Sequence, residues 1–327
     1  MPLGVSMALA SNPEPAESIP SSRPPTPRRQ GKEGTPSGGS STPRQPAAAS
    51  KRQVQSGSQG SVRVGVWQGS LCAVKQYNEG QDRAWAVEVN AATVIANRHA
   101  HIMVFYQCSQ GADGKLVHCE LALLDAFDFY KSSHIKGLRQ YSFIREWMLQ
   151  IAHALSFLHE ARVAHRDVKP ENILIVPKTA GAASQRLPEG AHEQYRALQA
   201  ELRETAGQLS VAPDAASQRL HDYMAKLCDF GSAFVASVES RDRKVPLKDL
   251  PGRTPRGSSK YACPMVCWMH LARVEEATVA GIWEAGVPVP PLFKDGYNPF
   301  AADVWSYGVT VFVLASGRHP FRMAHVK

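Results

Sequence analysis

Three side chains with complementary chemistry lie within the stretch from His165 to Asn172, which reads H-R-D-V-K-P-E-N. Asp167 supplies a carboxylate that can orient a hydroxyl group and accept its proton. Lys169 supplies an ammonium group that can reach a phosphate, and Asn172 supplies an amide oxygen that can hold a magnesium ion. Transfer of a phosphoryl group to a hydroxyl needs such a carboxylate together with charge neutralisation on the phosphates. The stretch therefore predicts phosphoryl-transfer chemistry.

This stretch resembles the catalytic loop of the eukaryotic protein kinase family, and the lysine two residues after the aspartate matches the Ser/Thr type. The resemblance covers about residues 54–327. It implies an α+β fold of two lobes, the first a small antiparallel sheet with one helix and the second mainly helical. It also implies bound ATP and Mg²⁺, catalytic roles for Asp167 and Lys169, and a metal-binding role for Asn172.

A second carboxylate follows the strand-like run Lys226-Leu227-Cys228, in the tripeptide Asp229-Phe230-Gly231. Downstream of such a loop, this D-F-G order supports the resemblance independently. It implies that Asp229 chelates the magnesium ion between the β- and γ-phosphates, that Phe230 packs inward and that Gly231 permits the turn.

Two upstream matches imply a nucleotide site. The run Cys72-Ala73-Val74-Lys75 resembles the strand motif whose lysine pairs with the α- and β-phosphates. The segment from Gly57 to Val62 resembles the last part of the family's glycine-rich loop, with Gln55 in place of the first glycine. The loop amides are still expected to cover the phosphates. We expect the nucleotide to contact Lys75, Ala73, Gly57, Gly60 and Val62.

The family's strand lysine pairs with a glutamate on the following helix, which the sequence predicts over about residues 83–97. Counting back from Arg98-His99, where the family often has R-H-P-N-I, the expected position falls on Asn90. Glu88 lies two residues earlier, and a small indel would restore it. We expect Glu88 to pair with Lys75, and the alternative is an exposed helix glutamate.

The run from Leu116 to Glu120 resembles the strand that leads into the hinge between the lobes. Cys119 would be the gatekeeper and Glu120 the first hinge residue. Backbone groups near Glu120 and Ala122 are then expected to hydrogen-bond the adenine. An ordinary buried strand is the alternative interpretation.

Later matches to the family come with departures. Residues 257–261 read G-S-S-K-Y, similar to G-T-x-x-Y but with Ser258 in place of threonine, and Cys263-Pro264-Met265 lacks the glutamate of Ala-Pro-Glu. Residues 303–308 match D-x-W-S-x-G, whose aspartate supports the catalytic-loop backbone in the family. Because Lys327 follows soon afterwards, we expect a truncated C-terminal lobe without its last helices.

Elements that could position these residues follow from periodicity. Alternating valines before and an apolar run after Gln68-Gly69-Ser70 predict a hairpin, as does Asp113-Gly114 between two further strand-like runs. A long core-facing helix is predicted from apolar residues at three- and four-residue spacing, namely Phe143, Ile144, Trp147, Met148, Ile151, Leu155 and Leu158.

Composition marks a tail and two insertions in the chain, and the element pattern together with the resemblance implies two lobes. Residues 1–53 are rich in Pro and Ser and predict a disordered tail. Residues 54–120 would form the N-terminal lobe and 121–327 the C-terminal lobe, with insertions at about 177–224 and 266–295. In the first insertion, residues 191–209 carry a helical apolar stripe that predicts either a short coiled-coil seam with a partner helix or a helix on the surface.

Composition restricts the classes of function. Half of the net charge of +8 lies in residues 1–53, and no arginine-rich stripe alternates with aromatics, so nucleic-acid binding has no support. No run of about 20 apolar residues and no signal peptide is evident, so we expect no membrane span. The six cysteines form no C-x-x-C pair, which favours reduced thiols in a cytoplasmic or nuclear protein without zinc.

Two hypotheses for the function follow. The first is an ATP-dependent Ser/Thr protein kinase that transfers the γ-phosphoryl group of Mg-ATP to protein hydroxyls. The alternative is an ATP-binding pseudokinase or scaffold, or an inactive truncated fragment. Labelled phosphate transfer, compared with an Asp167→Asn variant, distinguishes them.

Overall fold

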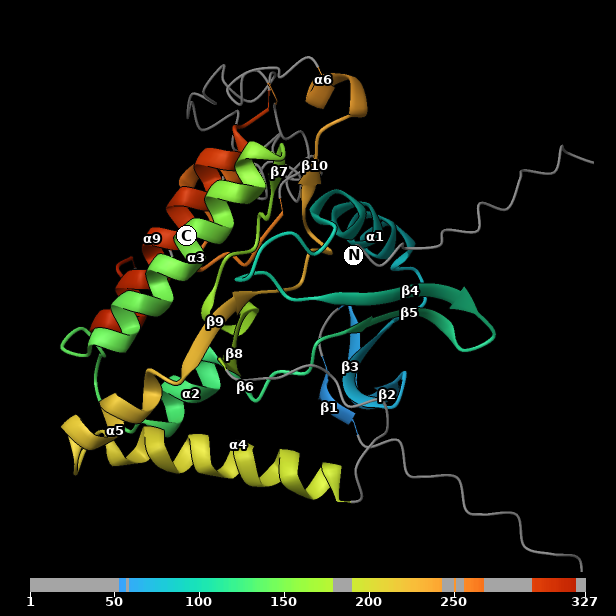
Figure 1. Cartoon of the computed structure of the whole chain (residues 1–327). Coiled ribbons are helices and arrows are strands. Elements are labelled where there is room, and N and C mark those ends of the chain that lie inside the picture. Colours follow the sequence, from blue (N-terminus) through green and yellow to red (C-terminus); the bar gives the residue numbers. More distant parts are fainter. Residues whose placement is uncertain are drawn as a thin grey trace, which may run out of the picture. The chain divides into compact units, whose positions relative to one another are not determined.

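The computed structural model describes residues 53–56, 59–178, 190–242, 250, 256–267 and 296–321, all within the unit Ser50–Lys327. Nearly all of the predicted tail and most of the insertion predicted over 266–295 lie outside the described residues. Within the unit, a sheet with one helix precedes a mainly helical part (Figure 1). This arrangement confirms the predicted α+β fold of two lobes.

An antiparallel sheet forms the N-terminal lobe. Gln68 and Gly69, with φ of 46° and 79°, make the first predicted hairpin turn, and Gly114, with φ of 89°, makes the second. The pairing register sets Val62 opposite Lys75 and Ala73 opposite Cys119. Adjacent strands therefore hold most of the predicted nucleotide contacts. In spatial order the strands are β1 (Gln53–Ser56), β2 (Gly60–Trp67), β3 (Ser70–Tyr77), β5 (Gly114–Cys119) and β4 (Phe105–Gly111).

Helix α1 (Asp82–Ile95) packs one stripe into the core. Its buried residues, Ala84, Glu88, Ala91 and Ile95, recur at three- and four-residue spacing, so they share one face. Ala96 ends the helix in the left-handed conformation. Because Glu88 belongs to an otherwise apolar stripe, its carboxylate is directed inward and needs a partner there.

Helix α3 (Ser142–Glu160) is the central helix of the C-terminal lobe. All seven apolar residues of the predicted pattern are buried along it, which confirms the predicted core-facing helix. Phe129 of α2 (Ala126–Ser132) packs edge-on against Phe143 and Trp147. The helix ends just before β7 (Val163–Ala164), and so it sets the position of the loop that follows.

Short strands frame that loop. β6 (Leu124–Asp125), β8 (Ile173–Pro177) and β9 (Tyr223–Leu227) form one antiparallel sheet, and β7 pairs with β10 (Phe234–Val235). The turn η1 (Pro170–Asn172) leads from the loop into β8, and α6 (Val238–Asp242) follows β10. The predicted D-F-G tripeptide lies between β9 and β10.

Two helices occupy the described part of the first predicted insertion, α4 (Ala191–Gln208) and α5 (Pro213–Leu220). Helix α4 lies alongside α2 (Figure 1). Leu202 and Leu209 of the predicted stripe are buried in this lobe, whereas 41% of Leu198 is exposed. The surface-helix alternative therefore accounts for most of the stripe.

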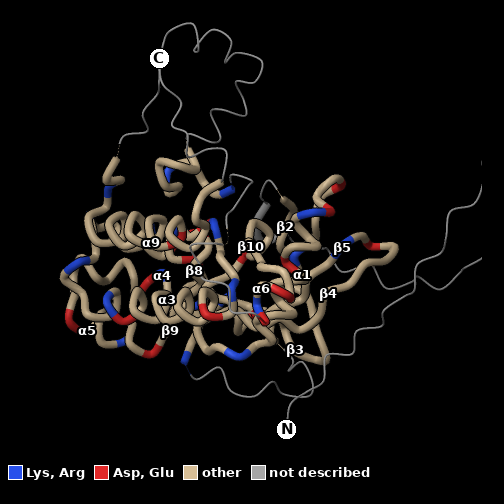
Figure 2. The backbone as a smooth tube through the Cα atoms, turned by 90° about the horizontal axis from the view of Figure 1, so that it is seen from above, with Lys and Arg blue, Asp and Glu red and all other residues tan. Residues whose placement is uncertain are grey.

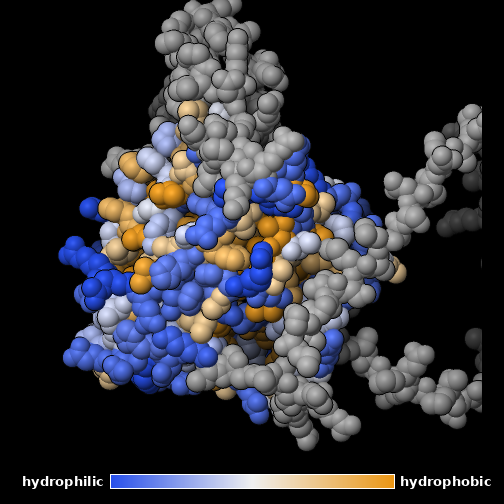
Figure 3. All heavy atoms as spheres, turned by 45° about the horizontal axis from the view of Figure 1, so that its top comes forward, coloured by the Kyte–Doolittle hydropathy of each residue, from blue (hydrophilic) through white to orange (hydrophobic). Residues whose placement is uncertain are grey.

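Helix α9 (Pro299–Ser316) is long and apolar enough, by length and composition, to cross a membrane. Half of that window is buried in the fold, and α9 packs on α3 and β7, as a core helix of a lobe does. Val304 and Phe312 on α9 are nevertheless exposed by 60% and 37%. On the face seen in Figure 3, apolar patches reach the surface between hydrophilic ones.

Acidic and basic residues are interspersed along the described backbone (Figure 2). No described element carries a long run of residues of one charge, so the small positive net charge is spread over a mixed, solvated surface.

Candidate active site

The catalytic-loop backbone is held by a buried carboxylate. Asp303 of α9 accepts hydrogen bonds from the backbone N–H groups of His165, at 2.7 Å, and Arg166, at 2.6 Å, and it contacts the His159 ring at 3.0 Å. Arg166 has a φ of 66°, a left-handed conformation that disfavours a long side chain. The two bonds to Asp303 stabilise this turn, so α9 fixes the direction in which the loop presents its side chains.

The Asp167 carboxylate is oriented by three donors. Its Oδ1 atom accepts from the Ser258 N–H at 2.8 Å. Its Oδ2 atom accepts from Lys169 Nζ at 2.8 Å and from Asn172 Nδ2 at 3.1 Å. The predicted base, phosphate-binding lysine and metal ligand are therefore one hydrogen-bonded cluster.

Ser258 closes the cluster from the segment after D-F-G. Its Oγ atom accepts from Lys169 Nζ at 2.8 Å. The preceding Gly257 has a φ of 111°, and a Cβ built there would lie 2.4 Å from the Arg166 carbonyl oxygen. Only glycine can bring the segment this close to the loop. Serine thus makes contacts here although the family motif has threonine.

Lys75 joins the two lobes through a pair of carboxylates. Its Nζ atom lies 2.8 Å from Glu88 Oε2 on α1 and 2.7 Å from Asp229 Oδ1 in D-F-G. Burial alone would lower the pKa of Lys75, but Glu88 and then Asp229 outweigh it and raise that pKa well above its ordinary value. Lys75 therefore stays charged.

Glu88, and not Asn90, occupies the helix position that faces Lys75. The Glu88 side chain is 1% exposed, whereas Asn90 lies on the exposed face of α1. The Tyr77 hydroxyl also donates to Glu88 Oε2, and the Tyr77 ring lies 4.6 Å from Lys75 Nζ. Tyr77 was not expected, although its position two residues after Lys75 places both side chains on one face of β3.

The residues of the predicted magnesium site offer suitable oxygens. Burial opposes ionisation of Asp229, but the nearby Lys75 ammonium outweighs it and holds the pKa of this carboxyl below its ordinary value. Asn172 donates through Nδ2 to the Asp167 carbonyl oxygen at 2.7 Å. Asn172 Oδ1 and Asp229 Oδ2 take no hydrogen bond from a described residue. One amide and one carboxylate oxygen are hard ligands that fit Mg²⁺, which keeps several waters.

The glycine-rich segment approaches D-F-G. Gly60 fits closely against β3, because a Cβ there would lie 2.1 Å from the Gln76 carbonyl oxygen. Gln59 reaches Ser232, with Nε2 3.5 Å from Oγ. Val62 packs against the cluster that contains the buried Ala73. Gly57 lies outside the described residues.

The predicted hinge residues have distinct partners. The Glu120 N–H donates to the Val104 carbonyl at 2.9 Å, and the Glu120 carboxylate pairs with Lys226 Nζ at 2.8 Å. The Ala122 carbonyl accepts from the Tyr195 hydroxyl at 2.8 Å. Neither the Glu120 carbonyl nor the Ala122 N–H bonds to a described residue. They lie among the backbone groups near Glu120 and Ala122 that the sequence resemblance implies for adenine.

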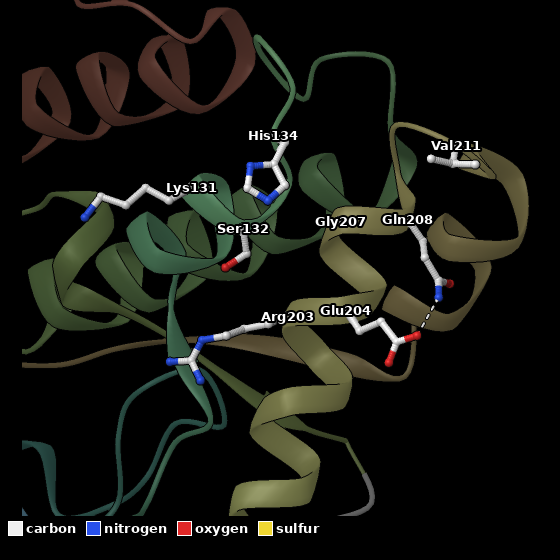
Figure 4. Close-up of a pocket in the computed structure, with 8 residues that line it drawn as sticks. All are labelled: Lys131, Ser132, His134, Arg203, Glu204, Gly207, Gln208 and Val211. Atoms are coloured by element: carbon white, nitrogen blue, oxygen red, sulfur yellow. Dashed lines mark hydrogen bonds between the residues drawn. The ribbon is translucent and has the colours of Figure 1, made fainter.

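A hollow of about 700 Å³ lies away from this cluster, between α2 and the C-terminal half of α4 (Figure 4). Glu204 turns toward Gln208, to which it is hydrogen-bonded at 3.1 Å, while the Arg203 side chain extends from the other side of the helix. No residue of the catalytic loop lines the hollow, and its side chains are mostly exposed, so it does not belong to the site described above.

Comparison with known proteins gives a consistent result. A family model described as "Protein kinase domain" matches residues 49–327. The chain is 28% identical over 260 residues to the serine/threonine-protein kinase ATG1 of Pyricularia oryzae, covering 73% of this chain and 21% of that protein. It is 25% identical over 238 residues to the CBL-interacting protein kinase 29 of Oryza sativa subsp. japonica, covering 73% and 35%.

A third similar protein is the SNF-related serine/threonine-protein kinase of Rattus norvegicus. It is 25% identical over 201 residues, which cover 62% of this chain and 16% of that protein. The chain thus spans between about a sixth and a third of the length of these curated relatives.

Proposed function

This chain belongs to the protein kinase domain family, and on that premise we propose that it transfers the γ-phosphoryl group of Mg-ATP to Ser or Thr hydroxyls of proteins. The observation that carries the proposal is the bonded set of charged groups in the described residues. Lys75 pairs with both Glu88 and Asp229, and Asp167 is bonded to Lys169 and Asn172. Phosphoryl transfer depends mainly on such positioning and charge stabilisation.

Each residue then has one task. Asp167 orients the substrate hydroxyl and receives its proton at a carboxylate oxygen. Lys169 stabilises the charge on the transferred group, and Lys75 holds the α- and β-phosphates. Asn172 and Asp229 would hold magnesium, which supplies charge neutralisation on the phosphates. The Ala122 N–H and the Glu120 carbonyl would bind the adenine, with Val62 and Ala73 against its faces and Gly57 and Gly60 in the loop over the phosphates.

The choice of Ser and Thr rests on Lys169 and Ser258. Both lie at the Asp167 carboxylate, so they shape the place where the acceptor hydroxyl would sit. All three similar proteins described above carry a Ser/Thr kinase or protein kinase name. The alternative, an ATP-binding protein without transfer, is less well supported, because none of the charged groups that transfer requires is missing.

The proposal extends to partners and location. Protein substrates follow from the reaction, and a cytoplasmic or nuclear location is supported by the six cysteines, which form no C-x-x-C pair. A partner helix on α4 would have to use exposed residues such as Leu198, because Leu202 and Leu209 are buried in the lobe.

Two measurements on the purified chain test the proposal. Mg-ATP should raise its melting temperature, because a ligand that binds only the folded state stabilises it. Incubation with γ-labelled ATP and a mixed protein substrate should place label on serine or threonine. Label confined to tyrosine would contradict the assigned acceptor, and thermal stabilisation without any transfer would favour the alternative.

A further inference from the structure

Helix α4 is hydrogen-bonded to the hinge. The Tyr195 hydroxyl donates to the Ala122 carbonyl at 2.8 Å. Gln199, one turn later on the same face, donates through Nε2 to the Leu123 carbonyl at 2.6 Å and to the Tyr195 hydroxyl at 2.9 Å. Two side chains of the insertion thus hold two consecutive hinge carbonyls, and we call this pair the hinge clamp.

The hinge clamp makes no hydrogen bond with the Ala122 N–H, the group proposed to bind the adenine. Ala122 gives its carbonyl to Tyr195, while its N–H makes no hydrogen bond to a described residue. On the next residue the Leu123 N–H donates to the Ile175 carbonyl at 3.1 Å. The peptide between Ala122 and Leu123 is therefore held on both sides, by Tyr195 at its carbonyl and by Ile175 at its N–H. The Ala122 N–H belongs to the preceding peptide, so its direction depends on how firmly this neighbouring peptide is held.

The helix that carries the hinge clamp is itself well anchored. Leu202 and Ala206 are fully buried, and Leu209 is 1% exposed. The Tyr141 hydroxyl donates to the Leu209 carbonyl at 3.0 Å, which fixes the C-terminal end of α4 to the start of α3. Since α4 also packs along α2, its position is set by the lobe rather than by the hinge.

The Tyr195 hydroxyl remains a donor at neutral pH. Burial raises the pKa of Tyr195 to about 12, so the phenol keeps its proton. With Gln199 donating to its oxygen, the hydroxyl both accepts and donates, and such chained bonds strengthen one another.

We propose that Tyr195 and Gln199 are positioning residues for adenine recognition, which hold the hinge so that the Ala122 N–H is presented to the nucleotide. The inference rests on the proposed function only in that the site binds ATP. It assigns to the insertion a task that no motif of the family match indicates. Loss of either hinge-clamp bond releases the Ala122 or the Leu123 carbonyl, so the hinge backbone can rotate. A bound nucleotide then loses part of its hydrogen bond to the Ala122 N–H, which corresponds to about a three- to tenfold change in Kd.

The test uses the full chain and three variants. Tyr195→Phe removes only the hydroxyl, and Gln199→Ala removes the amide. Gln194→Ala is the matched control, because Gln194 is an exposed residue of the same helix without a side-chain hydrogen bond to a described residue. Calorimetry gives Kd for Mg-ATP and for Mg-tripolyphosphate, which has no adenine. Hydrogen exchange reports on the backbone amides of residues 120–123, and steady-state rates give KM and kcat.

The expected result is specific to the adenine. Tyr195→Phe and Gln199→Ala should raise Kd and KM for ATP about three- to tenfold, leave kcat and the Kd for tripolyphosphate within twofold, and speed exchange at the hinge. Gln194→Ala should match the wild-type chain. Unchanged ATP affinity and hinge exchange in both variants would overturn the inference, as would equal losses for ATP and tripolyphosphate, which would indicate a general loosening of the lobe.

The two proposals fail in different ways. If the wild-type chain binds Mg-ATP but transfers no phosphate, the proposed function fails while the binding measurements still decide the role of the hinge clamp. If phosphate transfer is robust and Tyr195→Phe binds ATP as tightly as the wild type, the hinge clamp alone is wrong. A wild-type chain that binds no Mg-ATP would overturn both.

Discussion

Glu88 on α1 pairs with Lys75 on β3 at 2.8 Å, and Tyr77 donates to the same carboxylate oxygen. The buried stripe of α1 selects Glu88, because Ala84, Ala91 and Ile95 lie on the same face. The ion pair therefore depends on how α1 packs on the sheet, and it fixes Lys75 between the lobes. A substitution that breaks this pair should lower the catalytic rate more than it disturbs the fold.

Glu88→Gln should lower kcat/KM on the order of 100-fold, since Lys75 would be held by Asp229 alone and displaced from the phosphates. Asn90→Ala, two residues away on the exposed face, should leave kcat/KM within twofold. Steady-state rates with ATP and a Ser-containing protein check both. A larger loss from Asn90→Ala than from Glu88→Gln would show that α1 docks in another register.

Asp303→Asn should destabilise the chain by about 2–4 kcal/mol, because Asp303 is fully buried and accepts from two backbone N–H groups and contacts His159. Urea unfolding of this variant measures the loss. Asp128→Asn, at a half-exposed residue in the first turn of α2, serves as the control and should change stability by less than about 0.5 kcal/mol. Equal stability of the Asp303 variant and the wild type would refute the anchoring role.

Gly257→Ala should abolish most transfer while leaving the melting temperature within a few degrees. The added Cβ would collide with the Arg166 carbonyl at a φ of 111°, so the segment with Ser258 must move away from Asp167. Gly308→Ala is the counterpart, since nothing lies within 4 Å of its Cβ position inside helix α9. That variant should retain activity and gain up to about 1 kcal/mol of stability. Full activity of Gly257→Ala would contradict the close approach.

Asp125 should make the chain less stable as pH rises. Burial raises the pKa of its carboxyl from 3.8 to about 6 in the folded state, so the folded state holds a proton that the unfolded state has lost. Its stabilisation is complete below pH 3.8 and is lost as pH rises to about 6, amounting to about 2–3 kcal/mol. Asp125→Asn keeps the oxygen that caps α2 at Asp128 N–H and should flatten this part of the profile.

Urea unfolding at several pH values between 4 and 7.5 compares that variant with Asp113→Asn, a change in an exposed turn. The two variants should diverge across this range, with the Asp113 variant following the wild type. Parallel profiles for all three proteins would show that Asp125 does not titrate with a raised pKa.

Local patterns were sufficient for much of the fold. The dipeptides Gln68-Gly69 and Asp113-Gly114 favour tight turns by their local residue types. The spacing of apolar residues from Phe143 to Leu158 places them on one buried face of α3. Both signals lie within a few residues of the element that they predict, which is why sequence periodicity reveals them.

The residues of the site could be predicted from the sequence only where they belong to a recognisable motif. Asp167, Lys169, Asn172 and Asp229 follow from H-R-D-x-K-P-E-N and D-F-G. The choice between Glu88 and Asn90 depended on counting along α1, and burial of the helix stripe was needed to decide it. The role of Tyr195 at the hinge could not be predicted, because its partner is a backbone carbonyl 73 residues earlier and such a contact leaves no pattern in the sequence.

The most direct test of the central claim compares the initial rates of γ-phosphoryl transfer by the wild-type chain and by Asp167→Asn, at saturating Mg-ATP and equal concentrations of folded protein. The bonded cluster around Asp167 predicts a measurable wild-type rate and a loss of about 10²–10⁴-fold in the variant, with Kd for Mg-ATP unchanged, because only the acceptor of the hydroxyl proton is removed. Equal rates in the two proteins would contradict the account.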